Sequence, residues 1–212
     1  MNIEANISNI LHDLDEKIQL VAVSKTKPTD FILEAYQAGH RIFGENKVQE
    51  LVEKSTILPD DIQWHMIGHL QSNKVKYIAP FVSLIHSVDS KKLLIEINKR
   101  AKQHDRVIHC LLQIHISQES SKFGLSQDEA IELLEMKLTN VSIDGLMGMA
   151  TFTDDKQQIR SEFKSLKNTF EKAKSNFHKL SVLSMGMSGD YDIAIQEGSN
   201  MIRIGSSIFG TR

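Results

Sequence analysis

Residues 19–44 read QLVAVSKTKPTDFILEAYQAGHRIFG, and they contain a strand, a helix and the start of a second strand. Residues 19–24 form a short apolar run, which is typical of a buried strand. Residues 29–39 show the spacing of an amphipathic helix, and residues 41–44 begin the next apolar run. A strand that is followed by a helix and then by another strand is the repeating unit of a parallel α/β sheet.

The same alternation continues along the chain. Further apolar runs lie at residues 62–68, 82–88, 107–117, 141–149, 181–187 and 201–205. Further helical patterns lie at residues 45–54, 89–104, 126–138, 155–174 and 188–198. Together with an extra N-terminal helix, these eight units predict a single (β/α)8 TIM barrel over residues 1–212. An open doubly wound sheet is the alternative, although the chain has neither a GxGxxG nor a Walker motif.

Two of these helices have recognisable signals at their ends. Thr29 or Asp30 is expected to cap the first of them, and Gly39 lies just past its end. Ser126 and Glu129 have the three-residue spacing of a capping box at the start of another helix.

Composition excludes several classes of function. The net charge of −2 gives no electrostatic footprint for nucleic acid or for an anionic membrane. No apolar run approaches the length of about 18 residues that a membrane span requires, and the N-terminus lacks the pattern of a signal peptide. Cys110, the only cysteine, lies in an apolar run and is expected to be a buried core residue. We therefore expect a cytoplasmic protein.

Lys25 ends the first strand and is the first candidate for chemistry. Strand residues alternate between faces, so Val21, Val23 and Lys25 share one side. If the two valines fill the barrel, Lys25 points into its mouth, where apolar walls would lower the pKa of its amine and favour a nucleophile able to form a Schiff base. A lysine that extends to solvent from the end of a strand is the equally open alternative.

The segment around the last two strands resembles an anion site. TIM barrels often bind phosphate with the loops after strands seven and eight and with a short extra helix. Here Met187 and Ser188 end strand seven, and Gly205, Ser206 and Ser207 follow strand eight and begin one helical turn. A plain turn that closes the barrel is the alternative.

Arg203 lies in strand eight between two isoleucines. If those isoleucines face the surrounding helices, Arg203 lies inside the barrel beside the anion loop. A buried arginine stays charged and needs a partner, which would be Asp144 or Glu45 in an internal ion pair, or a bound ligand.

Other polar residues carry weaker signals. His65 and His69 are four apart, which in a strand is about 13 Å, so a metal site is not expected. Asn46 precedes a helical pattern and could be a helix cap. The sequence assigns no role to Lys27 or Lys122.

Several motifs together resemble one family. They are VAVSKTKP (21–28), FGENKVQE (43–50), WHMIGHLQSNK (64–74), HSVDS (86–90), SQESSKFG (117–124), GLMGMATF (145–152) and the long C-terminal run from Leu183 to Gly210. They are similar to the pyridoxal 5′-phosphate (PLP) homeostasis proteins, whose barrel resembles the N-terminal domain of alanine racemase. The resemblance runs without a gap from Val21 to the C-terminus.

The resemblance implies a PLP site. Lys25 would hold PLP as an aldimine, that is, a Schiff base, and Arg203 would face the pyridine nitrogen. Ser188, the turn Gly205-Ser206-Ser207 and the backbone near Met187 would hold the phosphate, and Asn46 would line the ring pocket.

The resemblance also implies a carrier rather than a catalyst. An arginine disfavours protonation of the pyridine nitrogen, and we expect no second domain that could supply another acid or base. We expect a monomer that supplies PLP to apo-enzymes. A PLP-dependent enzyme such as a weak amino-acid racemase is the alternative, and a PLP-free aldolase-type barrel is a further one.

Overall fold

The computed structural model describes residues 2–119 and 123–211, in which eight parallel strands close into one barrel. The strands are β1 (Gln19–Val23), β2 (Ile42–Glu45), β3 (Gln63–Met66), β4 (Leu84–Val88), β5 (Ile108–Gln113), β6 (Val141–Met147), β7 (Val182–Met187) and β8 (Met201–Ile204). They follow one another around the barrel in chain order, and β8 pairs with β1 to complete it. The (β/α)8 fold that the sequence predicted is confirmed.

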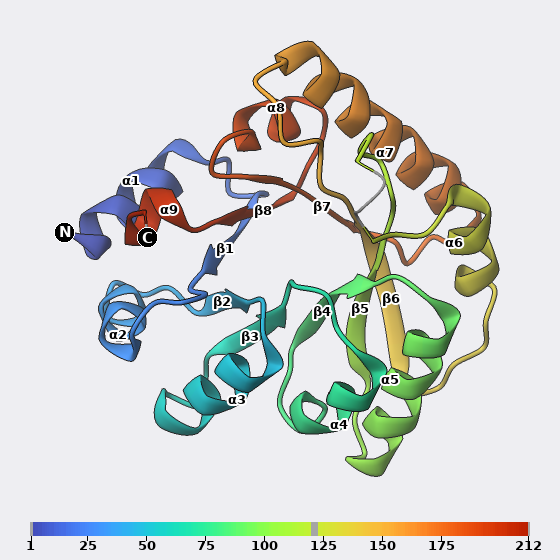
Figure 1. Ribbon diagram of the computed structural model, residues 1–212, viewed down its shortest axis with the longest axis horizontal. Helices are drawn as coiled ribbons and strands as arrows, with labels where there is room; N and C mark the ends of the chain where they lie inside the picture. The colour runs from blue at the N-terminus through green and yellow to red at the C-terminus, as the bar shows by residue number, and fades with distance from the viewer. Residues whose placement is uncertain (1, 120–122, 212) are drawn as a thin grey trace.

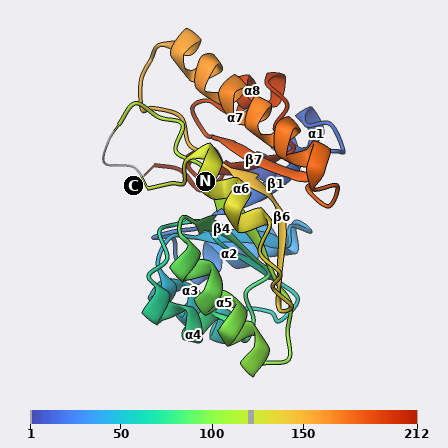
Figure 2. The same cartoon turned by 90° about the vertical axis from the view of Figure 1, so that its right-hand side faces the viewer.

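Helices surround the barrel on the outside (Figure 1). They are α1 (Ile3–Asp13), α2 (Thr29–Gln37), α3 (Val48–Ile57), α4 (Val75–Ile78), α5 (Lys91–Gln103), α6 (Gln127–Leu134), α7 (Lys156–Asn176), α8 (Tyr191–Gln196) and α9 (Ser206–Phe209), with a 3-10 turn η1 (Ser72–Lys74). Figure 2 shows α7 on the outer side of the barrel beside α8. The N-terminal helix α1 packs beside α9, where Asn6 Nδ2 donates to the carbonyl of Ile208 at 2.9 Å.

One local prediction is wrong, and two short elements were not foreseen. Neither Thr29 nor Asp30 caps α2: Pro28 is the N-cap, without a side-chain hydrogen bond, and Thr29 is already helical. Proline fixes φ near −65°, which suits the entry into a helix, so α2 begins at Thr29 without a capping side chain. The sequence also gave no sign of η1 or α4, because elements of three or four residues are too short to show a period.

The signals at the other helix ends are confirmed. Glu129 N donates to Ser126 Oγ at 3.2 Å, and Ser126 N donates to Glu129 Oε2 at 2.8 Å, which is the reciprocal capping box. Gly39 has φ +93°, a backbone conformation that favours glycine, just past the end of α2. The short turn expected after strand eight is α9.

The core has two parts. The larger part lies between strands and helices and includes the fully buried Cys110, as expected. The smaller part lies inside the barrel and consists of Val21, Leu84, Leu111, Met147 and Met201. Because these side chains fill the interior, the barrel is a packed core, and any ligand must bind at its end. Among the described residues, no helix is both long enough and apolar enough to cross a membrane.

Candidate functional site

A cavity of about 520 Å³ opens where the strands end at their C-termini. Seven of the eight residues singled out from the sequence contribute to its lining: Lys25, Asn46, Met187, Ser188, Arg203, Gly205 and Ser206. Ser207 is exposed on α9 and is not among the lining residues. The fold thus brings together side chains from β1, β2, β7 and β8 that lie up to about 180 positions apart in the sequence.

Lys25 lies two residues past the end of β1 and is half-buried at this cavity. The apolar side chains of Val23, Ile67 and Met149 line the cavity with it. Asn46 also lines the cavity and does not cap α3, since the N-cap of that helix is Lys47. Val21 on β1 thus lies in the packed interior, and the amine of Lys25, further along the chain, lies at the mouth of the barrel.

A buried ion cluster holds the backbone on both sides of Lys25. Lys54 Nζ donates to the carbonyl of Ser24 at 2.8 Å and to Oε1 of Glu45 and Glu50, each at 2.7 Å. Glu50 Oε1 also accepts from the backbone N–H of Thr26 at 2.5 Å. Thr26 has φ +62°, which is unfavourable for a β-branched residue, so these bonds stabilise a turn that the sequence alone would not favour.

Glu45 is the most buried member of that cluster, with no exposed surface. Burial raises the pKa of its carboxyl, and the hydrogen bonds from Lys54 and Ser24 oppose that effect. Ser24 Oγ donates to Glu45 Oε1 at 2.6 Å. Glu45 is therefore the partner of Lys54, and the predicted alternative in which it pairs with Arg203 is wrong.

The loops after β7 and β8 are joined directly. Gly205 N donates to Ser188 Oγ at 3.2 Å, which fixes the serine beside the start of α9. A Cβ on Gly205 would lie 3.1 Å from the carbonyl oxygen of Val23, so glycine allows the loop to approach β1 closely. The N–H of Met187 donates to Asp190 Oδ1 at 2.6 Å and thus already has an acceptor. The remaining donors of this cup are the Ser188 and Ser206 hydroxyls and the first amides of α9, which have no acceptor within that helix.

Arg203 lies inside the barrel, as the sequence predicted, and only 4% of its surface is exposed. Its Nη1 donates to Ser184 Oγ, and its Nη2 donates to the carbonyl of Gly148 at 3.1 Å. Asp144 is not its partner, because that carboxylate bonds to His109 and Ser142. Burial lowers the pKa of Arg203 to about 10, which leaves the guanidinium charged at neutral pH.

Two histidines lie buried beneath the cavity. His86 Nδ1 is 3.2 Å from Ser184 Oγ, and His86 Nε2 is 3.0 Å from His65 Nδ1. Burial lowers the pKa of His65 to about 3 and that of His86 well below its usual value, so both rings are neutral near pH 7. His69, by contrast, pairs with Asp89 and stacks on Phe123 at 4.0 Å. Neither His65 nor His69 lines the cavity.

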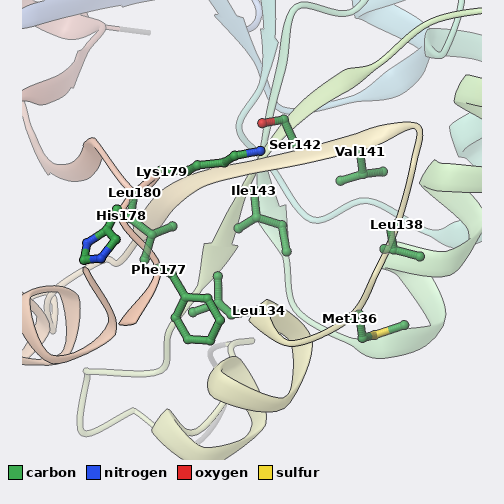
Figure 3. Close-up of a pocket in the computed structure, with 10 residues that line it drawn as sticks. All are labelled: Leu134, Met136, Leu138, Val141, Ser142, Ile143, Phe177, His178, Lys179 and Leu180. Atoms are coloured by element: carbon green, nitrogen blue, oxygen red, sulfur yellow. The ribbon is translucent and has the colours of Figure 1, made fainter. Parts of the chain in front are cut away.

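Another hollow, of about 310 Å³, lies at the opposite end of the barrel (Figure 3). The start of β6, the end of α6 and the segment between α7 and β7 form it. Most of its lining residues are apolar in type, such as Leu134 and Phe177, while Lys179 lies near Ser142 on the other side. Because ligands of such barrels bind at the C-terminal ends of the strands, this hollow is not the candidate site.

The family of the chain follows from comparison with known proteins. A model of the alanine racemase N-terminal domain matches residues 1–212. The pyridoxal phosphate homeostasis protein of Vibrio alginolyticus is 40% identical over 224 residues, which cover all of this chain and 96% of that protein. The chain belongs to this family. The protein of the same name from Aquifex aeolicus is 39% identical over 198 residues, which are 92% of this chain and 87% of that protein.

A solved relative has the same barrel. PipY of Synechococcus elongatus PCC7942, in a structure with PLP bound, superimposes with a TM-score of 0.89 at 34% identity. The match covers 98% of this chain and all of that one. The homeostasis family that the motifs indicated is thus confirmed, while the ligand-binding roles of the individual residues stay predictions.

The ion cluster yields a prediction about stability. Lys54→Met should destabilise the protein by about 3–5 kcal/mol, because it leaves the fully buried Glu45 without its cation. Lys167→Met on α7 is the control; it removes the ion pair of Lys167 with Glu171, half of whose side chain is exposed, and should cost about 0.5 kcal/mol or less. Urea denaturation measures both, and equal losses would contradict the role given to Lys54.

The buried histidines predict a dependence of stability on pH. An unfolded histidine binds a proton near pH 6.5, whereas His65 resists protonation in the fold until about pH 3, and His86 also has a lowered pKa. The unfolded chain therefore binds more protons below pH 6.5, and the free energy of unfolding should fall toward acid by up to about 1.4 kcal/mol per pH unit for each ring. In His65→Gln this slope should be smaller by about that amount between pH 6 and 4, whereas the exposed His178→Gln should keep it.

Proposed function

We propose that this protein binds PLP at the mouth of its barrel as a Schiff base on Lys25 and acts as an intracellular carrier in PLP homeostasis. One observation carries the proposal: an amine, a buried guanidinium and a cup of hydroxyl and amide donors open on the same cavity. The names of the curated relatives and the PLP-bound structure of PipY support it.

The residues of the cavity match three of the polar groups of PLP. PLP has one aldehyde, one ring nitrogen and one phosphate, and its aldehyde condenses with an amine to an imine with release of water. In this proposal Lys25 is the amine and Arg203 donates to the ring nitrogen. Ser188, Gly205 and Ser206, which line the cavity, hold the phosphate, and Ser207, which follows them on α9 outside the lining, adds its backbone N–H.

Two other lining residues have lesser parts. Asn46 lines the ring pocket with its amide. Met187 contributes its backbone at the phosphate. The phosphate has to compete for the N–H of Met187 with Asp190 Oδ1, which accepts from that N–H at 2.6 Å.

The donor at the ring nitrogen favours storage over turnover. Enzymes that use PLP as a strong electron sink keep its ring nitrogen protonated, and a guanidinium, which can only donate, opposes that protonation. The described residues that line the cavity include no tyrosine, histidine or cysteine; the carboxylates there are Asp154 and Asp190, and Asp190 already accepts from the N–H of Met187. We therefore propose that the protein is a cytoplasmic monomer that hands PLP to apo-enzymes. This function is favoured over that of a weak amino-acid racemase.

Lys25→Ala tests the anchor. The wild-type protein, mixed with PLP and freed from excess by gel filtration, should keep a yellow visible absorption band. Lys25→Ala should lose it, because Lys25 is the lysine among the described residues that line the cavity. Lys27→Ala is the matched control, because Lys27 Nζ donates to the carbonyl of Gly210 at 2.9 Å and does not line the cavity.

The outcomes separate the two candidate functions. A Lys25→Ala protein with the wild-type band would contradict the proposed anchor. Interconversion of pure amino-acid enantiomers by the wild type, lost in Lys25→Ala, would favour the racemase instead.

A further inference from the structure

A chain of hydrogen bonds crosses the barrel interior beneath the cavity. It runs from Arg203 on β8 to Ser184 on β7, then to His86 on β4 and His65 on β3. Each of these side chains is at most 4% exposed. They lie between the apolar interior and the ligand cavity, and only Arg203 also lines that cavity.

The chemistry of arginine gives this chain a direction. A guanidinium has five donors and no acceptor, so Ser184 Oγ must accept the bond from Arg203. The hydroxyl proton of Ser184 can then be donated to His86 Nδ1. His86 therefore carries its proton on Nε2, which donates to His65 Nδ1 and places the proton of that ring on Nε2 as well.

The opposite direction leaves one group unpaired. If His86 Nδ1 donated to Ser184, the hydroxyl would accept two bonds and its own proton would need another acceptor. Among the hydrogen bonds of the described residues, Ser184 Oγ has no other partner. A buried O–H without an acceptor is costly, so the direction from Arg203 to His65 is the favoured one.

The charges around the chain oppose protonation of its histidines. A proton added to His86 would place a second positive charge only two hydrogen bonds away from Arg203, and His86 has no exposed surface. His40, the titratable neighbour of His65, also disfavours a charge on that ring. Asp190 at the rim of the cavity favours the charge on Arg203 itself. One cation at the cavity end of a neutral chain is the arrangement that results.

We propose that Ser184 and His86 are positioning residues that hold the guanidinium of Arg203 at the cavity as a fixed donor. The proposal rests on the function proposed above, in which the ligand presents an acceptor nitrogen to Arg203. This hydrogen-bonded chain then selects ligands whose ring nitrogen is unprotonated. A protonated nitrogen is itself a donor, and the guanidinium of Arg203, which is also a donor, is held in place opposite it.

Ser184→Ala tests this role, with Ser87→Ala as its matched control. Both serines are fully buried: Ser184 contacts His86 in space, and Ser87 follows His86 in the sequence. Ser87 Oγ, however, has no hydrogen-bond partner among the described residues. The dissociation constant for PLP should rise about tenfold in Ser184→Ala, as expected for loss of one hydrogen bond to a charged group, and should not change in Ser87→Ala. Near-ultraviolet circular dichroism of bound PLP should also weaken only in Ser184→Ala.

The proton positions on the two histidines can be measured in the wild-type protein, so this test does not depend on whether a variant folds. Imidazole ¹⁵N NMR of the ligand-free protein should show His65 and His86 neutral, with the proton on Nε2 in both. Protons on Nδ1, or equal PLP affinity of the two serine variants, would overturn the positioning role alone. A wild-type protein that binds no PLP would overturn the proposed function and this inference together.

Discussion

The pairing of β8 with β1 is the constraint on which the site depends. Val21 on β1 lies opposite Arg203 on β8 in the register of this pair. The buried guanidinium is therefore a neighbour of the packed interior. Four residues after Val21, and just past the end of β1, the chain reaches Lys25. Without closure, the amine and the guanidinium would lie on opposite edges of an open sheet. Because the barrel closes, they share one cavity.

Burial of charge is the main energetic difficulty of this arrangement, and the fold meets it in two ways. Lys54 is surrounded by two carboxylates and a carbonyl, so its charge is matched by anions and its position fixes the turn at Lys25. Arg203 has no carboxylate hydrogen-bonded to it among the described residues; a serine hydroxyl and a carbonyl accept from it instead. Its charge is thus left for a ligand at the cavity to use.

The sequence predicted the parts that follow from period and position. The alternation of apolar runs and helical patterns gave the barrel, and alternation within β1 and β8 placed Lys25 and Arg203 correctly. It could not predict the partners, because these depend on contacts between elements that are distant in the chain. Lys54 looks like an ordinary lysine of a surface helix, and Ser184 and His86 look like polar interruptions of apolar strands.

The boundaries were less predictable than the elements. The run at residues 107–117 is longer than β5, which ends at Gln113, because the apolar residues continue into a loop that pairs Ile114 with Leu125. Residues 149–154 also line the cavity; the motif GLMGMATF covers residues 149–152, but the sequence assigned none of them a ligand-binding role. Lys122, to which no role was assigned, lies outside the described residues.

Borohydride reduction of the protein loaded with PLP, followed by peptide mass spectrometry, identifies the lysine that holds PLP, because it converts the imine to a stable amine on the lysine that formed it. We expect one pyridoxyl phosphate group per chain on the peptide that contains Lys25, and none on that peptide when PLP is omitted. Attachment mainly at another lysine, or no stable attachment at all, would contradict the account.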